Sequence, residues 1–191
     1  MGPLTDFWHQ REEAEFRGVD DVPVRFVRFC AKENDRVVVI CPGRIESYVK
    51  YAELAYDLFH SGFDVMIIDH RGQGRSGRIL TDSHRGHVVR FSDYVDDLAA
   101  LWQQEVAPGH WRKRFILAHS MGGAIATLFC SVTSSIATLL RCARLCSVSS
   151  CVSRTGWYAI FSIGLRAISA FVKSMRWVPV AGGRCPFRST C

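Results

Sequence analysis

The stretch Phe115-Ile-Leu-Ala-His-Ser-Met-Gly-Gly123 decides the fold of this 191-residue chain. It begins as a short apolar run, reaches a serine flanked by small residues, and then becomes helical in composition through Phe129. The pattern predicts a strand, a tight turn that carries Ser120, and a helix. Small residues are needed at such a turn because its backbone is strained and crowded, and Ala118 and Gly122 supply them.

A serine at a strand-to-helix turn of this kind can act as a nucleophile, and the motif typical of the geometry is Gly-x-Ser-x-Gly. The match is partial, because Ala118 stands at the first glycine position. A serine that only caps the N-terminus of the helix is the alternative interpretation. The sequence around the turn has to decide between the two.

Strand and helix patterns alternate along the chain before Phe115. The predicted strands are Val22–Phe29, Arg36–Cys41 and Phe63–Ile68, and the predicted helices are Trp8–Glu15, Tyr48–Phe59 and Ser92–Trp102. This alternation indicates an α/β fold with helices on both faces of a mostly parallel sheet. The carboxyl ends of parallel strands meet at one edge of a sheet. We therefore expect Arg44, the loop Asp69–Gly77 and Ser120 on one rim.

Three motifs in this order resemble a known family. They are Cys41-Pro-Gly-Arg44, Asp69-x-x-Gly-x-Gly-x-Ser76 and Ala118-His-Ser-Met-Gly122. Together they resemble the monoacylglycerol lipase and lysophospholipase branch of the α/β-hydrolase superfamily, over about residues 1–129. The resemblance implies a serine ester hydrolase that cleaves a lysophospholipid or a monoacylglycerol through an acyl-enzyme and needs no cofactor.

The resemblance also implies roles for individual residues. Ser120 would be the nucleophile, and the backbone N–H groups of Arg44 and Met121 would form the oxyanion hole. Fixed donors at that point are each worth about 2.7 to 4 kcal/mol in the transition state. Ala118, His119 and Gly122 would shape the turn. The Arg44 side chain could face a lipid phosphate, and an exposed, solvated arginine is the alternative.

The acid and base of a catalytic triad are not recognisable. In the family that these motifs resemble, they follow the serine in the order acid, then histidine, but the chain has no Asp, Glu or His after Ser120. His119 is not a candidate base, because it is the immediate neighbour of the nucleophile. We therefore leave the acid and base unassigned and expect this chain to hydrolyse esters at no more than about a thousandth of an intact relative's rate.

A rival interpretation starts from Gly72-Gln-Gly-Arg-Ser-Gly77, which fits the dinucleotide-binding pattern. That site needs a helix to open at the last glycine, and residues 78–87 lack a helical apolar period. The glycines are therefore interpreted as loop geometry. His70, His84 and His87 lack metal-ligand spacing, so we expect solvated loop histidines and no metal site.

The sequence changes character near residue 130. Residues 1–105 hold 13 Lys and Arg and all 18 Asp and Glu, whereas residues 106–191 hold 11 Lys and Arg and no acid. Enrichment in Ser, Arg and Cys without acids is typical of out-of-frame translation, and a divergent C-terminal segment is the alternative. We predict the N-terminal part of an α/β-hydrolase domain at 1–129 and a basic tail at 130–191. The C-terminal strands should be missing, which would leave Phe115–Ala118 at an open, aggregation-prone edge.

The tail allows few functional predictions. Residues 157–172 are too short for a membrane span and could form an amphipathic helix at a membrane surface. Cys142, Cys146 and Cys151 lack zinc-site spacing. The basic excess comes without a nucleic-acid-binding motif, so no nucleic-acid partner is expected.

The start of the chain lacks the features of a signal peptide. We expect a location on the cytoplasmic side, peripheral to the inner membrane, and make no prediction of oligomeric state. A non-catalytic fragment or a membrane-associating basic protein is the alternative function.

Overall fold

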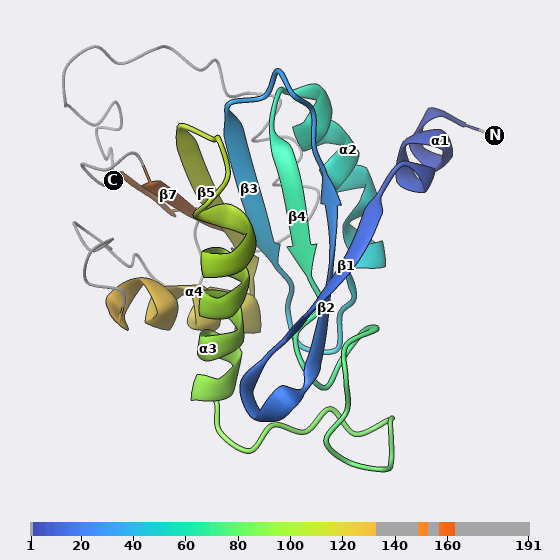
Figure 1. Cartoon of the computed structure of the whole chain (residues 1–191), viewed down its shortest axis with the longest axis vertical. Coiled ribbons are helices and arrows are strands. Elements are labelled where there is room, and N and C mark those ends of the chain that lie inside the picture. The colour runs from blue at the N-terminus through green and yellow to red at the C-terminus, as the bar shows by residue number, and fades with distance from the viewer. Residues whose placement is uncertain (1, 133–148, 153–156, 163–191) are drawn as a thin grey trace.

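The computed structural model describes residues 2–132, 149–152 and 157–162, which build a seven-stranded sheet with helices on both faces (Figure 1). The strands are β1 (Glu12–Arg17), β2 (Pro23–Phe29), β3 (Arg36–Cys41), β4 (Asp64–Ile68), β5 (Lys113–His119), β6 (Ser149–Val152) and β7 (Trp157–Ser162). The helices are α1 (Pro3–His9), α2 (Ala52–His60), α3 (Ser92–Leu101) and α4 (Met121–Val132), with shorter helical turns η1 (Val19–Asp21), η2 (Tyr48–Tyr51) and η3 (Trp102–Val106).

The strand order is β1-β2-β4-β3-β5-β7-β6. Strands β4, β3, β5 and β7 run parallel, and β1, β2 and β6 pair antiparallel to their neighbours. The helices α1 and α2 contact each other on one face, and α3 and α4 pack together on the other. The predicted α/β fold is therefore confirmed, and the sheet is mixed, because three of its six pairings are parallel and three are antiparallel.

The apolar run of β3 shows why the sheet needs two covering layers. Alternate side chains of a strand point to opposite faces. Val37 and Val39 are buried in the core beneath α3 and α4, while Val38 and Ile40 are buried in the core beneath α1 and α2. A strand buried on both faces cannot alternate polar and apolar residues, and this explains the continuous run in the sequence.

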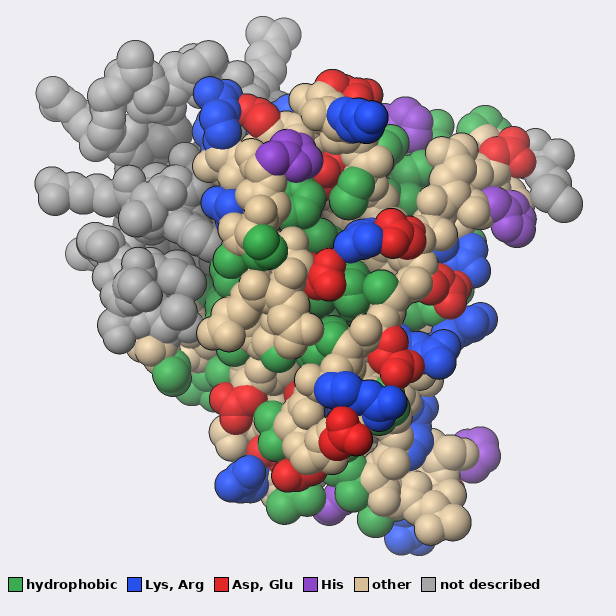
Figure 2. Space-filling model, viewed as in Figure 1, with side chains coloured by type: hydrophobic (Ala, Val, Ile, Leu, Met, Phe, Trp, Pro, Cys, Tyr) green, Lys and Arg blue, Asp and Glu red, His purple; other side chains and the backbone are tan. Residues whose placement is uncertain are grey.

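The prediction of a helix over Trp8–Glu15 is wrong, because α1 ends at His9 and β1 begins at Glu12. The antiparallel partner decides the conformation. In β1, Glu12 lies opposite Arg28 of β2 and Glu15 lies opposite Arg25. Carboxylate and guanidinium groups are 2.5 Å apart in the first pair and 3.1 Å apart in the second. Such cross-strand pairs favour a strand, and Figure 2 shows acidic and basic side chains close together on this face.

The expected open edge at Phe115–Ala118 is also corrected by the structure. Strand β7 pairs with β5 in parallel register, with Leu117 opposite Ile160, and β6 pairs with β7. Four of the six residues of β7 are Trp, Tyr, Ile and Phe, which favour strands. The predicted amphipathic helix is therefore wrong for these six residues, and its remainder, 163–172, lies outside the described residues, as do Cys142 and Cys146.

Within the described part of the chain, none of the helices has both the length and the apolar character needed to cross a bilayer. The division into residues 1–129 and 130–191 stays a prediction, although α4 continues to Val132, across that boundary.

Candidate active site

The turn between β5 and α4 has the geometry that the sequence predicts. Ser120 is exposed and adopts a left-handed backbone conformation with φ of 49°. Such a conformation is strained in a residue with a Cβ atom and is typical of functional sites. Among the described residues, no N–H of the first turn of α4 donates to the Ser120 hydroxyl, as it would to a capping serine. The geometry favours a nucleophile over a cap.

Gly122 is required by a contact between two elements. A Cβ atom built at this position would lie 2.1 Å from the carbonyl oxygen of Cys41 and 2.6 Å from that of Pro42. The first turn of α4 therefore packs directly against the end of β3. Ala118, by contrast, sits in the strand opposite Cys41 and is buried, so a methyl group is tolerated where the motif has its first glycine.

The turn after β3 leaves one backbone donor uncommitted. The N–H of Gly43 donates to Oε2 of Glu46 at 2.6 Å, and the N–H of Ile45 donates to Oε1 of Gln73 at 3.0 Å. Between them, the N–H of Arg44 meets no acceptor within the residues that the structure describes, and the same is true of Met121. Both predicted oxyanion donors are thus available to a ligand, and their roles stay a prediction.

The loop after β4 is folded around Asp69. Its carboxylate accepts the N–H of Arg75 at 2.8 Å, the N–H of Tyr48 at 2.6 Å and the hydroxyl of Ser47 at 3.0 Å. Burial raises the pKa of Asp69, while these donors act in the opposite direction. A Cβ atom at Gly74 would lie 2.0 Å from this carboxylate, so the glycine is needed for close approach.

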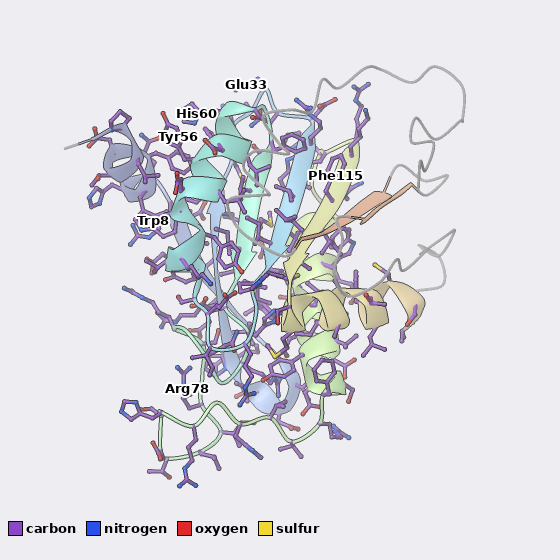
Figure 3. The ribbon with its side chains drawn as sticks, turned by 180° about the vertical axis from the view of Figure 1, so that it is seen from behind. Trp8, Glu33, Tyr56, His60, Arg78 and Phe115 are labelled. Atoms are coloured by element: carbon purple, nitrogen blue, oxygen red, sulfur yellow. The ribbon has the colours of Figure 1, made fainter. Side chains whose placement is uncertain are left out.

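The conformation of the same loop does not fit a dinucleotide-binding site. Gly77 is followed by a loop that continues to the start of α3 at Ser92, and no helix opens at Gly77 as that site requires. The loop lies beyond the carboxyl end of β4, and Figure 3 shows Arg78 of this loop far from Phe115 near the start of β5. The interpretation of the glycines as loop geometry is confirmed.

Glu46 joins the turn after β3 to the turn that carries the serine. Besides the Gly43 N–H, its carboxylate accepts the Tyr51 hydroxyl at 2.6 Å, contacts the Lys50 ammonium, and lies 3.2 Å from Nδ1 of His119. Burial raises the pKa of Glu46, but the hydrogen bonds outweigh it and hold the pKa at about 2. The group is therefore a carboxylate at neutral pH. Sequence reasoning missed both Glu46 and Gln73, since neither belongs to a fixed position of a motif.

The three loop histidines differ in environment. His84 and His87 are exposed, as predicted, but His70 is fully buried. It follows β4 directly, and its ring lies edge-on to that of Tyr94 at 5.7 Å. Burial lowers the pKa of His70 to about 4, and an interaction with the backbone of Pro42 opposes this only in part. The expectation of a solvated histidine at position 70 is therefore wrong.

The Arg44 side chain is exposed, and its Nη2 donates to the carbonyl oxygen of Gly86 at 3.4 Å. It therefore reaches the loop between β4 and α3. Apolar side chains that are open to solvent lie on the turn after β3 and on the segment between β4 and α3, namely Ile45, Ile79, Leu80, Val89 and Phe91. No group of three or more His, Cys, Asp or Glu in the described ranges is arranged to hold a metal ion.

Comparisons with known proteins identify the family and the fold. The profile of the family described as serine aminopeptidase, S33, matches residues 32–178. Lysophospholipase L2 of Escherichia coli K12 is 84% identical over 129 residues, which are 68% of this chain and 38% of that protein. The monoacylglycerol lipase of Mycolicibacterium smegmatis is 33% identical over 116 residues, which are 60% of this chain and 40% of that protein.

Among solved structures, an α/β hydrolase from Novosphingobium aromaticivorans superimposes with a TM-score of 0.53 at 20% identity, over 66% of this chain and 41% of that one. This likeness concerns the fold. The chain thus spans about two fifths of the length of the relatives that it matches.

Proposed function

Because this chain belongs to the serine aminopeptidase S33 family of α/β hydrolases, we propose that it carries the nucleophile and oxyanion site of a lipid ester hydrolase. Ser120 Oγ attacks the acyl carbonyl, the ester C–O bond breaks as the hydroxyl proton passes to the leaving alcohol, and water then hydrolyses the acyl-serine to free the fatty acid and the serine. One observation carries the proposal: the strained Ser120 turn packs against a turn whose Arg44 N–H has no acceptor among the described residues.

The favoured substrate is a lysophospholipid. The 84% identical protein is a lysophospholipase by name, and the Arg44 guanidinium is an exposed cation on the rim of the site. Arginine suits phosphate recognition through its planar set of donors. A monoacylglycerol, the substrate named for the more distant relative, carries no phosphate and is the second candidate.

We further propose that the rim meets its substrate at a membrane surface on the cytoplasmic side. Ile45 is 85% exposed, Val89 63% and Phe91 41%, and apolar side chains of this kind insert into the interface of lipid aggregates. Arg44 and Arg90, both exposed, would face the negatively charged headgroups.

A fluorophosphonate probe tests the nucleophile. The chain should be labelled at Ser120, more slowly than an intact relative because the triad acid and base are unassigned, and a Ser120→Ala variant should not be labelled, because the oxyanion site supports attack at this position. Ser131→Ala, at an exposed serine of α4, is the matched control and should be labelled like the wild type. Labelling that survives in Ser120→Ala would remove Ser120 from the role. No labelling of the wild type would favour the non-catalytic alternative.

The substrate class is tested in parallel by Arg44→Gln. This change should weaken the protection that a lysophospholipid gives against the probe and leave protection by a monoacylglycerol unchanged. Equal effects on the two lipids would contradict recognition of the phosphate by Arg44.

A further inference from the structure

We propose that Gln73 is a positioning residue of the oxyanion site, because its carboxamide fixes the turn Gly43–Ile45 that presents the N–H of Arg44. The inference rests on the proposed ester hydrolase function and assigns a residue to it that no motif identifies. Gln73 lies on the loop after β4 and acts through the turn after β3.

The contacts of Gln73 bracket Arg44 on both sides. Its Nε2 donates to the carbonyl oxygen of Gly43 at 2.9 Å, and its Oε1 accepts the N–H of Ile45 at 3.0 Å. The side chain is 8% exposed, so water competes little for these bonds. The carboxamide of Gln73 therefore binds the carbonyl oxygen of the residue before Arg44 and the N–H of the residue after it. The N–H of Arg44 itself stays uncommitted within the described residues.

The turn needs such support because it is strained. Ile45 has φ of 59°, a conformation that is an outlier for a β-branched residue. Residues in such conformations persist only when their surroundings determine them, at a cost of about 1 to 3 kcal/mol. The Gly43 N–H is held separately by Glu46. Without Gln73, the Gly43 carbonyl and the Ile45 N–H would lose their described partner, and Ile45 would be free to relax.

Gln73 is itself held in place. It stands between two glycines with positive φ, Gly72 at 76° and Gly74 at 54°. Its own N–H donates to the carbonyl oxygen of His70 at 3.1 Å, and its carbonyl oxygen accepts the N–H of Ser76 at 3.2 Å. A side chain on so constrained a loop can fix a neighbouring turn. This is the requirement for a preorganised donor.

Three variants separate the two hydrogen bonds. Gln73→Met keeps the length of the side chain and removes both bonds. Gln73→Glu keeps an acceptor for the Ile45 N–H but cannot donate to the Gly43 carbonyl as a carboxylate. Gln103→Met is the matched control, at an exposed glutamine of η3. Loss of an oxyanion donor costs about a hundredfold to a thousandfold in rate. Misplacing that donor should cost about tenfold to a hundredfold.

The first readout is the rate constant for covalent modification of Ser120 by a fluorophosphonate, measured over probe concentration so that reactivity separates from probe binding. We expect the maximal rate to fall in the order wild type, Gln73→Glu, Gln73→Met, with probe binding unchanged and Gln103→Met equal to the wild type. Equal maximal rates in wild type and Gln73→Met, or a fall matched by Gln103→Met, would overturn the proposal.

The second readout does not depend on reactivity. Amide hydrogen exchange of the peptide that contains Ile45 should become faster in Gln73→Met and stay unchanged in Gln103→Met, because the N–H loses its acceptor. Unchanged exchange would overturn the proposal even if the rate falls. If the wild-type chain is not labelled, the proposed hydrolase function fails, and exchange at Ile45 still decides whether Gln73 holds the turn.

Discussion

His70 should make the stability of the fold depend on pH between about 7 and 4. Its folded-state pKa of about 4 lies below the ordinary value of 6.5, so the unfolded chain binds a proton first as the pH falls. The stability is therefore full above the unfolded pKa and is lost as the pH falls toward the folded pKa. A difference of about 2.5 units at 1.36 kcal/mol per unit amounts to about 3 kcal/mol over the whole window, and about 2 kcal/mol of it falls between pH 7 and 5.

Urea denaturation at about pH 7 and about pH 5 measures this effect. The wild type should lose about 2 kcal/mol of unfolding free energy more over this interval than His70→Phe, which keeps an aromatic ring against Tyr94 but cannot titrate. His84→Gln, at an exposed histidine, should behave like the wild type. Glu46 does not interfere in this pH interval. Its pKa in the folded chain is about 2, below the ordinary glutamate value of 4.5, so the stability that it contributes is lost only as the pH falls below about 4.5. A His70→Phe variant with the full wild-type loss would refute the reasoning.

Two further substitutions test the packing that positions the site. Gly122→Ala should destabilise the chain by at least about 2 kcal/mol, because the added methyl carbon would lie 2.1 Å from a carbonyl oxygen at the end of β3, whereas Gly2→Ala, where the methyl meets nothing, should stay within about 0.5 kcal/mol. Asp97→Ala should cost about 3 to 5 kcal/mol in urea denaturation, since it removes the carboxylate 2.5 Å from the fully buried Arg71 and leaves the guanidinium with Asp93 at 3.9 Å. Asp21→Ala, at an exposed ion pair, should cost no more than about 1 kcal/mol, and equal costs for the two aspartates would contradict the role of burial.

The sequence predicted those elements whose own residues determine them. The continuous apolar run of β3 and the small residues around Ser120 have one physical explanation each, and the structure agrees with both. The strand β1 could not be predicted in this way, because Glu12–Arg17 is polar and becomes a strand through its pairing with the arginines of β2. For the same reason β7 was missed: its register depends on β5, a distant part of the chain.

The burial of single residues and the side-chain contacts between separate loops could not be predicted from local sequence patterns either. Nothing in the residues around His70 distinguishes it from His84 and His87, yet of the three only His70 is buried. Glu46 and Gln73 both bind the backbone of Gly43, in the turn after β3, and no sequence motif connects either residue with that turn. Their roles follow from distances between atoms of separate loops.

The three sequence motifs form one hydrogen-bonded structure, and this explains why a partial match at Ala118 is tolerated. Asp69 ties the loop after β4 to Ser47 and Tyr48, Gln73 ties it to the turn at Arg44, and Glu46 ties that turn to His119. Each link uses a buried or half-buried carboxylate or amide, and Gly122 brings the start of α4 against the end of β3. The position of Ser120 relative to the Arg44 N–H is thus determined by these cross-links more than by the first residue of the motif, Ala118, whose side chain is buried in the core beneath α3 and α4. His119 belongs to the same set of links: its Nδ1 is engaged with Glu46, which supports a structural role for this histidine beside the serine.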